Sequence, residues 1–202
     1  MKLNVPSGWD EVTIKQYYNL CEALEMDWED DTQKVIAMLS ALTNTSIKDI
    51  NNDVGVSDLR KYIKRIAFIS AKRKEFIPRP TVRVGKKRFN VDLIIKASTA
   101  SSFIDLSELV KTKELANLNT HRVLAIFFHE VNWFGFRKKR SVQSQKDIEN
   151  YLLENCTMDI AFGYSAFFLT SWLNLSKATE AFLKRETERM VRKVANQVER
   201  VS

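Results

Sequence analysis

The sequence contains little glycine, proline and cysteine. Among its 202 residues there are only 5 Gly, 3 Pro and 2 Cys. So few glycines and prolines exclude collagen-like, linker-like and low-complexity chains, and they disfavour a turn-rich β-sandwich or barrel. The two cysteines, Cys21 and Cys156, belong to no CxxC motif or His/Cys cluster, so we expect two reduced thiols. A chain of this length can bury a core without a disulfide or a metal ion.

A long hydrophobic run is also missing. The longest uncharged stretch, residues 160–176, has 17 residues and includes Ser, Thr, Asn and Gly. A membrane-spanning helix needs about 18 or more apolar residues, so we expect a buried helix here and no membrane span. The first twelve residues, MKLNVPSGWDEV, include no apolar segment typical of a secretory signal, so we expect no export.

Motifs for common enzyme chemistry do not occur. The sequence has no G-x-G-x-x-G, no G-x-x-x-x-G-K-[ST] and no G-x-S-x-G. The two histidines, His121 and His129, are eight residues apart, too far along a helix to share one metal ion easily. The acidic segment 27–31, DWEDD, fits a loop before a helix N-terminus better than a cation site. We therefore expect no enzyme activity, no cofactor, no metal site and no small-molecule substrate.

The net charge of +7 is distributed unevenly along the chain. Residues 1–60 carry 5 basic and 11 acidic side chains, a net charge of −6, whereas residues 61–100 carry 12 basic and 2 acidic ones, a net charge of +10. The two parts can attract each other within one molecule or between neighbouring copies. The basic part can also face a polyanion, or simply be solvated.

Apolar spacing predicts helices over most of the chain. Thr13 and Gln16 form a capping-box pattern before a helix over 14–26. Further helices are expected over 32–43, after Ser46, after a cap at Ser57, over 98–111 and 119–130, and from Ser144 onward. Residues 157–174 are apolar around most of the circumference and predict a central buried helix, with Phe162, Phe167, Phe168 and Trp172 largely buried. A separate amphipathic helix capped by Ser176 is expected over 177–200.

One β-hairpin interrupts this helical pattern. Pro78 and Pro80 exclude helix, and residues 81–91, TVRVGKKRFNV, alternate apolar and polar side chains around a glycine. We expect Lys86, Lys87 and Arg88 at an exposed tip, and a partly covered face formed by Val82, Val84, Phe89 and Val91. The fold class is therefore mainly α, a helical bundle with one inserted β-hairpin at about 81–91, in a single domain over 1–202 with a sub-boundary near 76–81.

Basic residues next to aromatic ones form the candidate interaction surface. Segments 72–74 and 86–88 are basic, and residues 132–141, NWFGFRKKRS, are predicted to be irregular. Basic and aromatic side chains together suit phosphate contact and base stacking, and exposed aromatics also suit a protein interface; Trp133, Phe134 and Phe136 can instead belong to the core. The candidates are Lys72, Arg73, Lys74, Lys86, Lys87, Arg88, Trp133, Phe134, Phe136, Arg137, Lys138, Lys139 and Arg140.

The opening PSGWDEVTIKQYYNLCEAL, the segment LSALTNTSIKDI and the later FIDLSEL and LAIFF segments resemble a group of bacteriophage proteins. These are uncharacterised proteins encoded among the structural genes of tailed phages, the crAss-like and related phages of Bacteroidetes hosts. The resemblance covers most of the chain, includes no catalytic motif and transfers no functional residue. It implies a virion structural protein or a tail or head assembly factor, found in the host cytoplasm during assembly or in the virion.

The function expected from these observations is non-enzymatic. We expect a multi-copy phage structural or assembly protein that contacts itself or other virion proteins. The alternative is a nucleic-acid-associated protein whose basic middle segment contacts phosphates.

Overall fold

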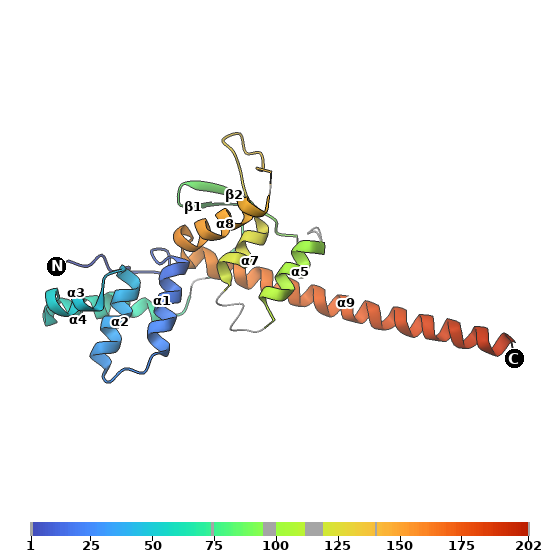
Figure 1. Cartoon of the computed structure of the whole chain (residues 1–202), viewed down its shortest axis with the longest axis horizontal. Helices are drawn as coiled ribbons and strands as arrows, with labels where there is room; N and C mark the ends of the chain where they lie inside the picture. Colours follow the sequence, from blue (N-terminus) through green and yellow to red (C-terminus); the bar gives the residue numbers. More distant parts are fainter. Residues whose placement is uncertain (1, 74, 95–99, 112–118, 140, 202) are drawn as a thin grey trace.

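The structure is a computed structural model that describes residues 2–73, 75–94, 100–111, 119–139 and 141–201, without the side chains of 100–103, 180, 182, 183 and 188–201. Helices dominate this part of the chain, and one small antiparallel sheet accompanies them, so the predicted mainly α class is confirmed (Figure 1). The helices are α1 (Ile14–Glu25), α2 (Asp31–Thr43), α3 (Ile47–Asp53), α4 (Val56–Arg65), α5 (Ala100–Leu109), α7 (Thr120–Phe127), α8 (Val142–Asn155) and α9 (Met158–Val201), with a 3-10 turn η1 (Ile66–Ser70).

The capping box predicted for the first helix is confirmed. The Thr13 hydroxyl accepts from the Gln16 backbone N–H, and the Gln16 side chain accepts from the Thr13 backbone N–H. The Gln16 amide then donates to the Leu42 carbonyl at 2.6 Å, which ties α1 to the end of the neighbouring α2. One capping residue thus fixes both the start of a helix and its packing partner.

Two other predicted caps have different outcomes. Ser46 caps α3, as expected, because its hydroxyl accepts from the Asp49 backbone N–H. The predicted cap at Ser57 is wrong, because α4 already begins at Val56 with Gly55 at the N-cap position. Gly55 makes no side-chain cap, so the extended backbone alone permits this start.

The predicted hairpin is confirmed, and a third strand extends it. Strand β1 (Thr81–Val84) pairs with β2 (Lys87–Val91), which pairs with β3 (Phe128–Glu130), all antiparallel. Val84, Phe89 and Val91 are buried and Val82 is half-buried, so the covered face is as predicted. Gly85 and Lys86 alone form the turn, and the placement of Lys87 and Arg88 at the tip is wrong. Both lie in β2, and Lys87 is half-buried because it shares the covered face with its partner Val84.

The third strand replaces the end of a predicted helix. A helix was expected over 119–130, but α7 ends at Phe127 and the next three residues are β3. Phe128 pairs with Val91 and is buried on the covered face against Phe89, with ring centroids 5.8 Å apart. The pairing of β3 with β2 thus outweighs the local helical pattern.

The last two predicted helices are one continuous helix. α9 runs for 44 residues, about 66 Å at 1.5 Å per residue, so the predicted break at Ser176 is wrong. Its first turns lie in the core, and its C-terminal half projects far beyond the body of the molecule (Figure 1). α8 begins at Val142 with a Ser141 cap, two residues before the predicted start.

Full burial in the first turns of α9 is confined to one face of the helix. Met158, Ala161, Tyr164 and Phe168 are fully buried, so one face of the helix is central. Phe162, Phe167 and Trp172 are partly buried and pack against this core, whereas Phe168 is fully buried. The uniform apolar composition of 157–174 therefore supplies a core face and also a partly exposed flank.

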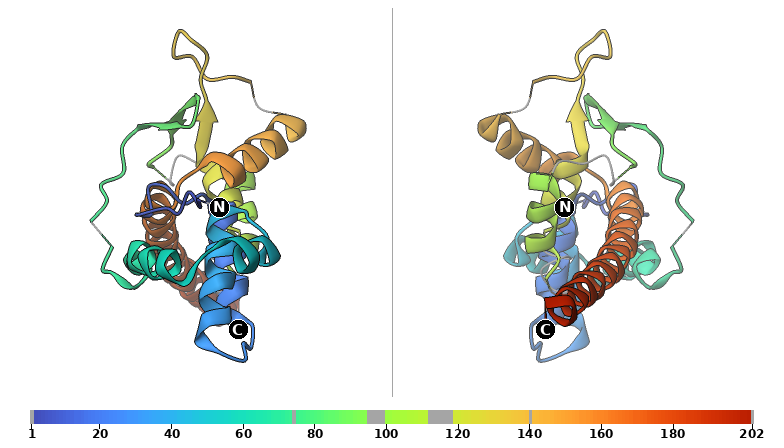
Figure 2. Two further views of the ribbon diagram at one scale, coloured as in Figure 1. Left: turned by 90° about the vertical axis from the view of Figure 1, so that its left-hand side faces the viewer. Right: turned by 90° about the vertical axis from the view of Figure 1, so that its right-hand side faces the viewer.

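The N-terminal segment before α1 contacts both the η1 turn and the start of α9. The Val12 carbonyl accepts from Met158 N–H at 2.7 Å, and the Cys156 carbonyl accepts from Ile14 N–H at 3.0 Å. Trp9 packs its ring edge-to-face against Phe68 and Phe162. Residues 71–73 and 75–80 then lead to the sheet, and in both views of Figure 2 they lie along the outside of the body.

Candidate interaction surface

Residues 131–139, which we call the aromatic loop, form a small hairpin of their own beyond β3. The Asn132 backbone N–H donates to the Phe136 carbonyl at 2.9 Å, and the Gly135 N–H donates to the Asn132 carbonyl at 3.0 Å. The Asn132 side chain also accepts from the Phe136 N–H. Gly135 has a φ of +83°, a left-handed conformation that side chains oppose. These bonds give the loop a defined shape.

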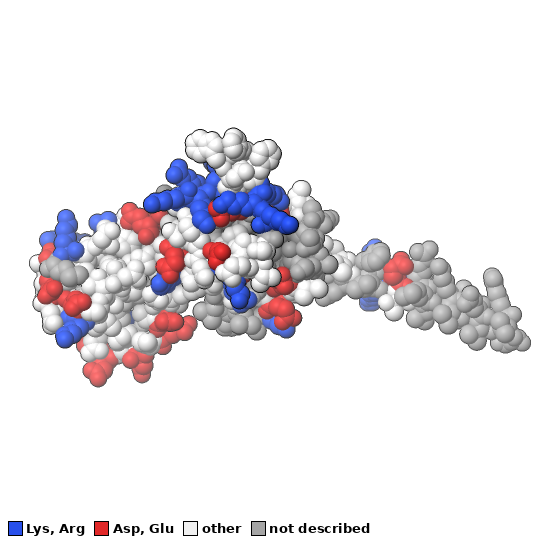
Figure 3. All heavy atoms as spheres, turned by 45° about the horizontal axis from the view of Figure 1, so that its top comes forward, with Lys and Arg blue, Asp and Glu red and all other residues white. Residues whose placement is uncertain are grey.

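The tip of the aromatic loop exposes three large rings. Trp133, Phe134 and Phe136 are 92%, 80% and 71% exposed. Of the two interpretations of these residues, the core is excluded and the exposed surface is confirmed. Figure 3 shows this tip as a white projection above a band of basic side chains.

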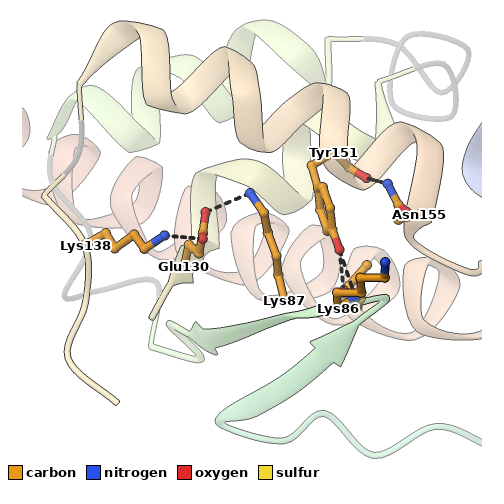
Figure 4. A network of polar contacts seen from close by, with 7 residues as sticks. Lys86, Lys87, Glu130, Lys138, Tyr151 and Asn155 are labelled. Carbon is orange, nitrogen blue, oxygen red and sulfur yellow. Dashed lines mark hydrogen bonds and ion pairs between the residues drawn. The ribbon is translucent and has the colours of Figure 1, made fainter. Parts of the chain in front are cut away.

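A half-buried carboxylate anchors the base of the loop. Glu130 lies on the covered face of β3 and is bound by Lys87 Nζ at 3.0 Å and Lys138 Nζ at 2.5 Å (Figure 4). Burial alone would raise the pKa of Glu130, but the two ammonium groups outweigh it and hold the pKa below its ordinary value. Glu130 thus stays ionised at neutral pH and fastens the loop strand to β2.

A second acid fastens the other side of the loop. Asp92, just after β2, pairs with Arg137 and lies 2.7 Å from His129 Nε2. Burial would raise the pKa of Asp92, whereas Arg137 and His129 together lower it below its ordinary value. Two of the four basic residues predicted after the aromatic tip, Arg137 and Lys138, therefore hold the loop in place as well as charging its surface.

The hairpin turn is held by a tyrosine of α8. The Tyr151 hydroxyl accepts from the Lys86 backbone N–H at 3.0 Å and donates to the Val84 carbonyl at 3.1 Å. The Lys87 ammonium lies 4.5 Å from the centre of the same ring. Gly85 has a φ of +53°, and a Cβ there would lie 2.9 Å from the tyrosine oxygen. Only glycine fits this turn, so the exposed Lys86 is fixed in position.

The predicted site residues fall into two groups. Lys86, Lys87, Arg88 and the aromatic loop lie together on or beside the sheet. Lys72 and Arg73 lie on the segment before it, where the Arg73 guanidinium is 3.3 Å from the centre of the Phe162 ring. Arg73 therefore packs on the aromatic cluster of Trp9 and Phe162, away from the loop. Lys74 and Arg140 lie outside the described residues.

Two residues that position the surface, Asp92 and Glu130, were not among the candidates. Both are acids within a basic region, and each is bound by basic residues from two different segments. An acid and its basic partner that lie far apart in the sequence form no recognisable sequence motif. Only the tertiary pairing of β2 with β3 brings them together.

Four basic side chains around the sheet, Arg83, Lys86, Arg88 and Lys139, are exposed and make no ion pair within the described part of the chain. They account for much of the excess positive charge beside the aromatic loop. The surface thus combines an apolar tip with a basic surround. Such a surface has the composition of one that can bind another macromolecule.

The described residues lack two further features. No three His, Cys, Asp or Glu side chains gather there in a way that could hold a metal ion. Of the helices in those residues, none has the length and apolar character to cross a membrane. Comparison of the chain with protein-family models, with curated proteins and with solved structures finds no match.

Proposed function

We propose that this chain is a non-enzymatic assembly protein of tailed bacteriophages, a virion structural or a tail or head assembly component that acts in a multi-copy complex. The phage setting rests on the sequence resemblance described above. The mode of action, protein–protein contact, rests on the aromatic loop.

The exposed aromatic tip is the observation that carries this proposal. Three rings at 71–92% exposure place a large apolar area in water, which is costly for a monomer and useful at an interface. Aromatic side chains are also the residues that most often dominate binding energy. Because hydrogen bonds already fix the loop, little entropy is lost when a partner binds.

The experiment measures complex formation by size-exclusion chromatography with light scattering. The purified chain is run alone at high concentration and with the products of the genes encoded beside its own. We expect oligomers or mixed complexes, and we expect Trp133→Ser/Phe134→Ser to abolish them. Val56→Ser is the matched control, because Val56 is as exposed as Phe136, at 71%, but lies on α4. A strict monomer that also ignores all neighbouring gene products would refute the proposal.

Nucleic-acid binding is the second candidate, and the unmatched basic residues favour it. Arg83, Lys86, Arg88 and Lys139 are exposed and can neutralise phosphates. If this function is correct, a DNA mobility shift weakens steeply with salt, and Lys86→Glu/Arg88→Glu removes it. Absence of a shift at low salt would eliminate this candidate.

A further inference from the structure

A second charged surface lies on the opposite side of the molecule from the aromatic loop. The connection between α1 and α2 forms what we call the acidic recess, with a volume of about 470 Å³ and a lining of Met26, Asp27, Trp28, Glu29, Asp30, Asp31 and Lys34. The α1–α2 connection is at the bottom of Figures 1 and 2, and the aromatic loop is at the top. The two surfaces therefore cannot meet within one copy.

The acidic recess has a defined wall that includes apolar surface. The Trp28 indole N–H donates to the Ala23 carbonyl at 2.6 Å, which pins the ring beside the end of α1. Met26 is 57% exposed at the same place. Asp30 caps α2 by accepting from the Gln33 backbone N–H. These bonds give the α1–α2 connection a defined shape.

The charge of the acidic recess is unmatched. Its lining has four carboxylates and one ammonium group, Lys34, and none of the four carboxylates makes an ion pair within the described ranges. Across the described residues, Asp58–Lys61 is the only ion pair that joins the acidic part, 1–60, to the basic part, 61–100. The ion pairs of the described residues therefore leave the carboxylates of the acidic recess without a cationic partner.

We infer that the aromatic loop of one copy docks into the acidic recess of a second copy. This inference rests on the proposed function and names the partner of the same surface. The Trp133 and Phe134 rings would meet Met26 and Trp28, while the basic side chains behind the rings would face the carboxylates of the recess. Apolar contact at the centre with opposite charges around it is the usual arrangement of a specific interface.

The geometry of this contact has a consequence for assembly. The loop and the recess are different surfaces of one chain, so the contact is head-to-tail, and each bound copy still offers a free loop or a free recess. Such contacts propagate until a ring closes or a filament grows. The described residues thus contain both halves of a repeating contact.

The test uses two variants, each with one surface disabled. The loop variant is Trp133→Ser/Phe134→Ser/Lys139→Glu, and the recess variant is Glu29→Lys/Asp31→Lys, which keeps the capping residue Asp30. Circular dichroism and melting temperature first establish that both are folded. Light scattering at 100 mM NaCl should show that wild type self-associates and that each variant alone is monomeric.

Mixing the two variants gives the decisive measurement. The recess variant retains an intact loop, and the loop variant retains an intact recess, so the mixture should form a 1:1 dimer that cannot extend. Self-association of wild type should also weaken about tenfold or more between 50 and 500 mM NaCl, because salt screens the charges. Nuclease treatment should leave it unchanged.

Several results would overturn the inference, and they separate it from the proposed function. If the recess variant associates like wild type while the loop variant does not, the loop binds elsewhere and the proposed function survives. If wild type binds a neighbouring gene product through the loop but never itself, the partner is not a second copy. A mixture that stays monomeric, or association lost on nuclease treatment, also refutes head-to-tail docking. If no association of any kind occurs, both proposals fail.

Discussion

At the scale of single residues, the centre of the core is a pair of stacked rings. Phe127 of α7 and Phe168 of α9 lie with centroids 3.9 Å apart, and both are buried. Phe168→Ala leaves a cavity that the rigid helices around it cannot close. We expect a loss of about 3–5 kcal/mol in the free energy of unfolding, measured by urea melts.

Phe167→Ala is the control for this substitution, because the neighbouring ring is only half-buried. Its loss should be clearly smaller than that of Phe168→Ala. Equal losses in the two variants would mean that α9 is packed on both flanks.

The half-buried His121 makes stability depend on pH. Burial, with a smaller effect of Arg122, lowers the pKa of His121 to about 4, and its Nδ1 lies 3.2 Å from the Tyr18 hydroxyl. In the unfolded chain a histidine protonates near about pH 6.5, so the unfolded state binds the proton first. The free energy of unfolding should therefore fall as the pH drops from 6.5 to 4.

His121→Gln should flatten that slope in urea melts recorded between pH 7 and pH 4. His129→Gln is the control, because it removes the only other histidine and leaves His121 in place. If the slope persists in His121→Gln and disappears in His129→Gln, His121 is not the source of the pH dependence and the prediction is wrong.

At the scale of elements, the segment before the sheet is clamped to α9. The Tyr164 hydroxyl accepts from the Arg79 backbone N–H at 3.1 Å and donates to the Arg79 carbonyl at 2.8 Å. Phe76 lies directly over Gly163, where an added Cβ would come within 2.0 Å of the ring. This glycine in the middle of a helix therefore serves the close approach of another segment.

Gly163→Ala should displace this segment despite the better helix propensity of alanine. We expect a lower free energy of unfolding and faster proteolysis within 71–80. In the double variant Phe76→Ala/Gly163→Ala the clash is absent, so its loss should be less than the sum of the two single losses. Simple additivity would show that Phe76 does not pack on Gly163.

The elements also show how far the sequence determines the fold. Local signals gave the capping box at Thr13, the hairpin around Gly85 and the irregular segment after Asn132. They failed where a tertiary contact decides the outcome. The apolar run 123–128 suits a helix throughout, and only pairing with β2 ends the helix at Phe127 and makes Phe128 the first residue of a strand.

The sequence predicted the residues of the candidate surface but not the ion pairs that hold them together. Exposure of the three aromatic side chains could be proposed because they fit no helical period. The pairs Glu130–Lys87 and Asp92–Arg137 join residues 43 and 45 positions apart, and no local pattern encodes them. Ser176 failed as a cap because serine is also tolerated inside a helix, and nothing after it stops α9.

At the scale of the whole molecule, the C-terminal half of α9 stands apart from the body (Figure 1). We expect that ending the chain after residue 177 changes the melting temperature by no more than about 2 °C, because the buried side chains among those described in α9 lie at Phe168 and before. The hydrodynamic radius should fall markedly. A large drop in melting temperature would mean that the removed helix packs against the body.

The continuity of α9 has a mechanical consequence. An unbroken helix behaves as a stiff rod, and the 34 residues from Phe168 to Val201 extend for about 50 Å at 1.5 Å per residue. Tilting its free end would exert leverage on the stacked Phe127 and Phe168 rings at its root. Through Tyr164, which grips the segment leading into β1, the same tilt would strain the sheet from which the aromatic loop projects.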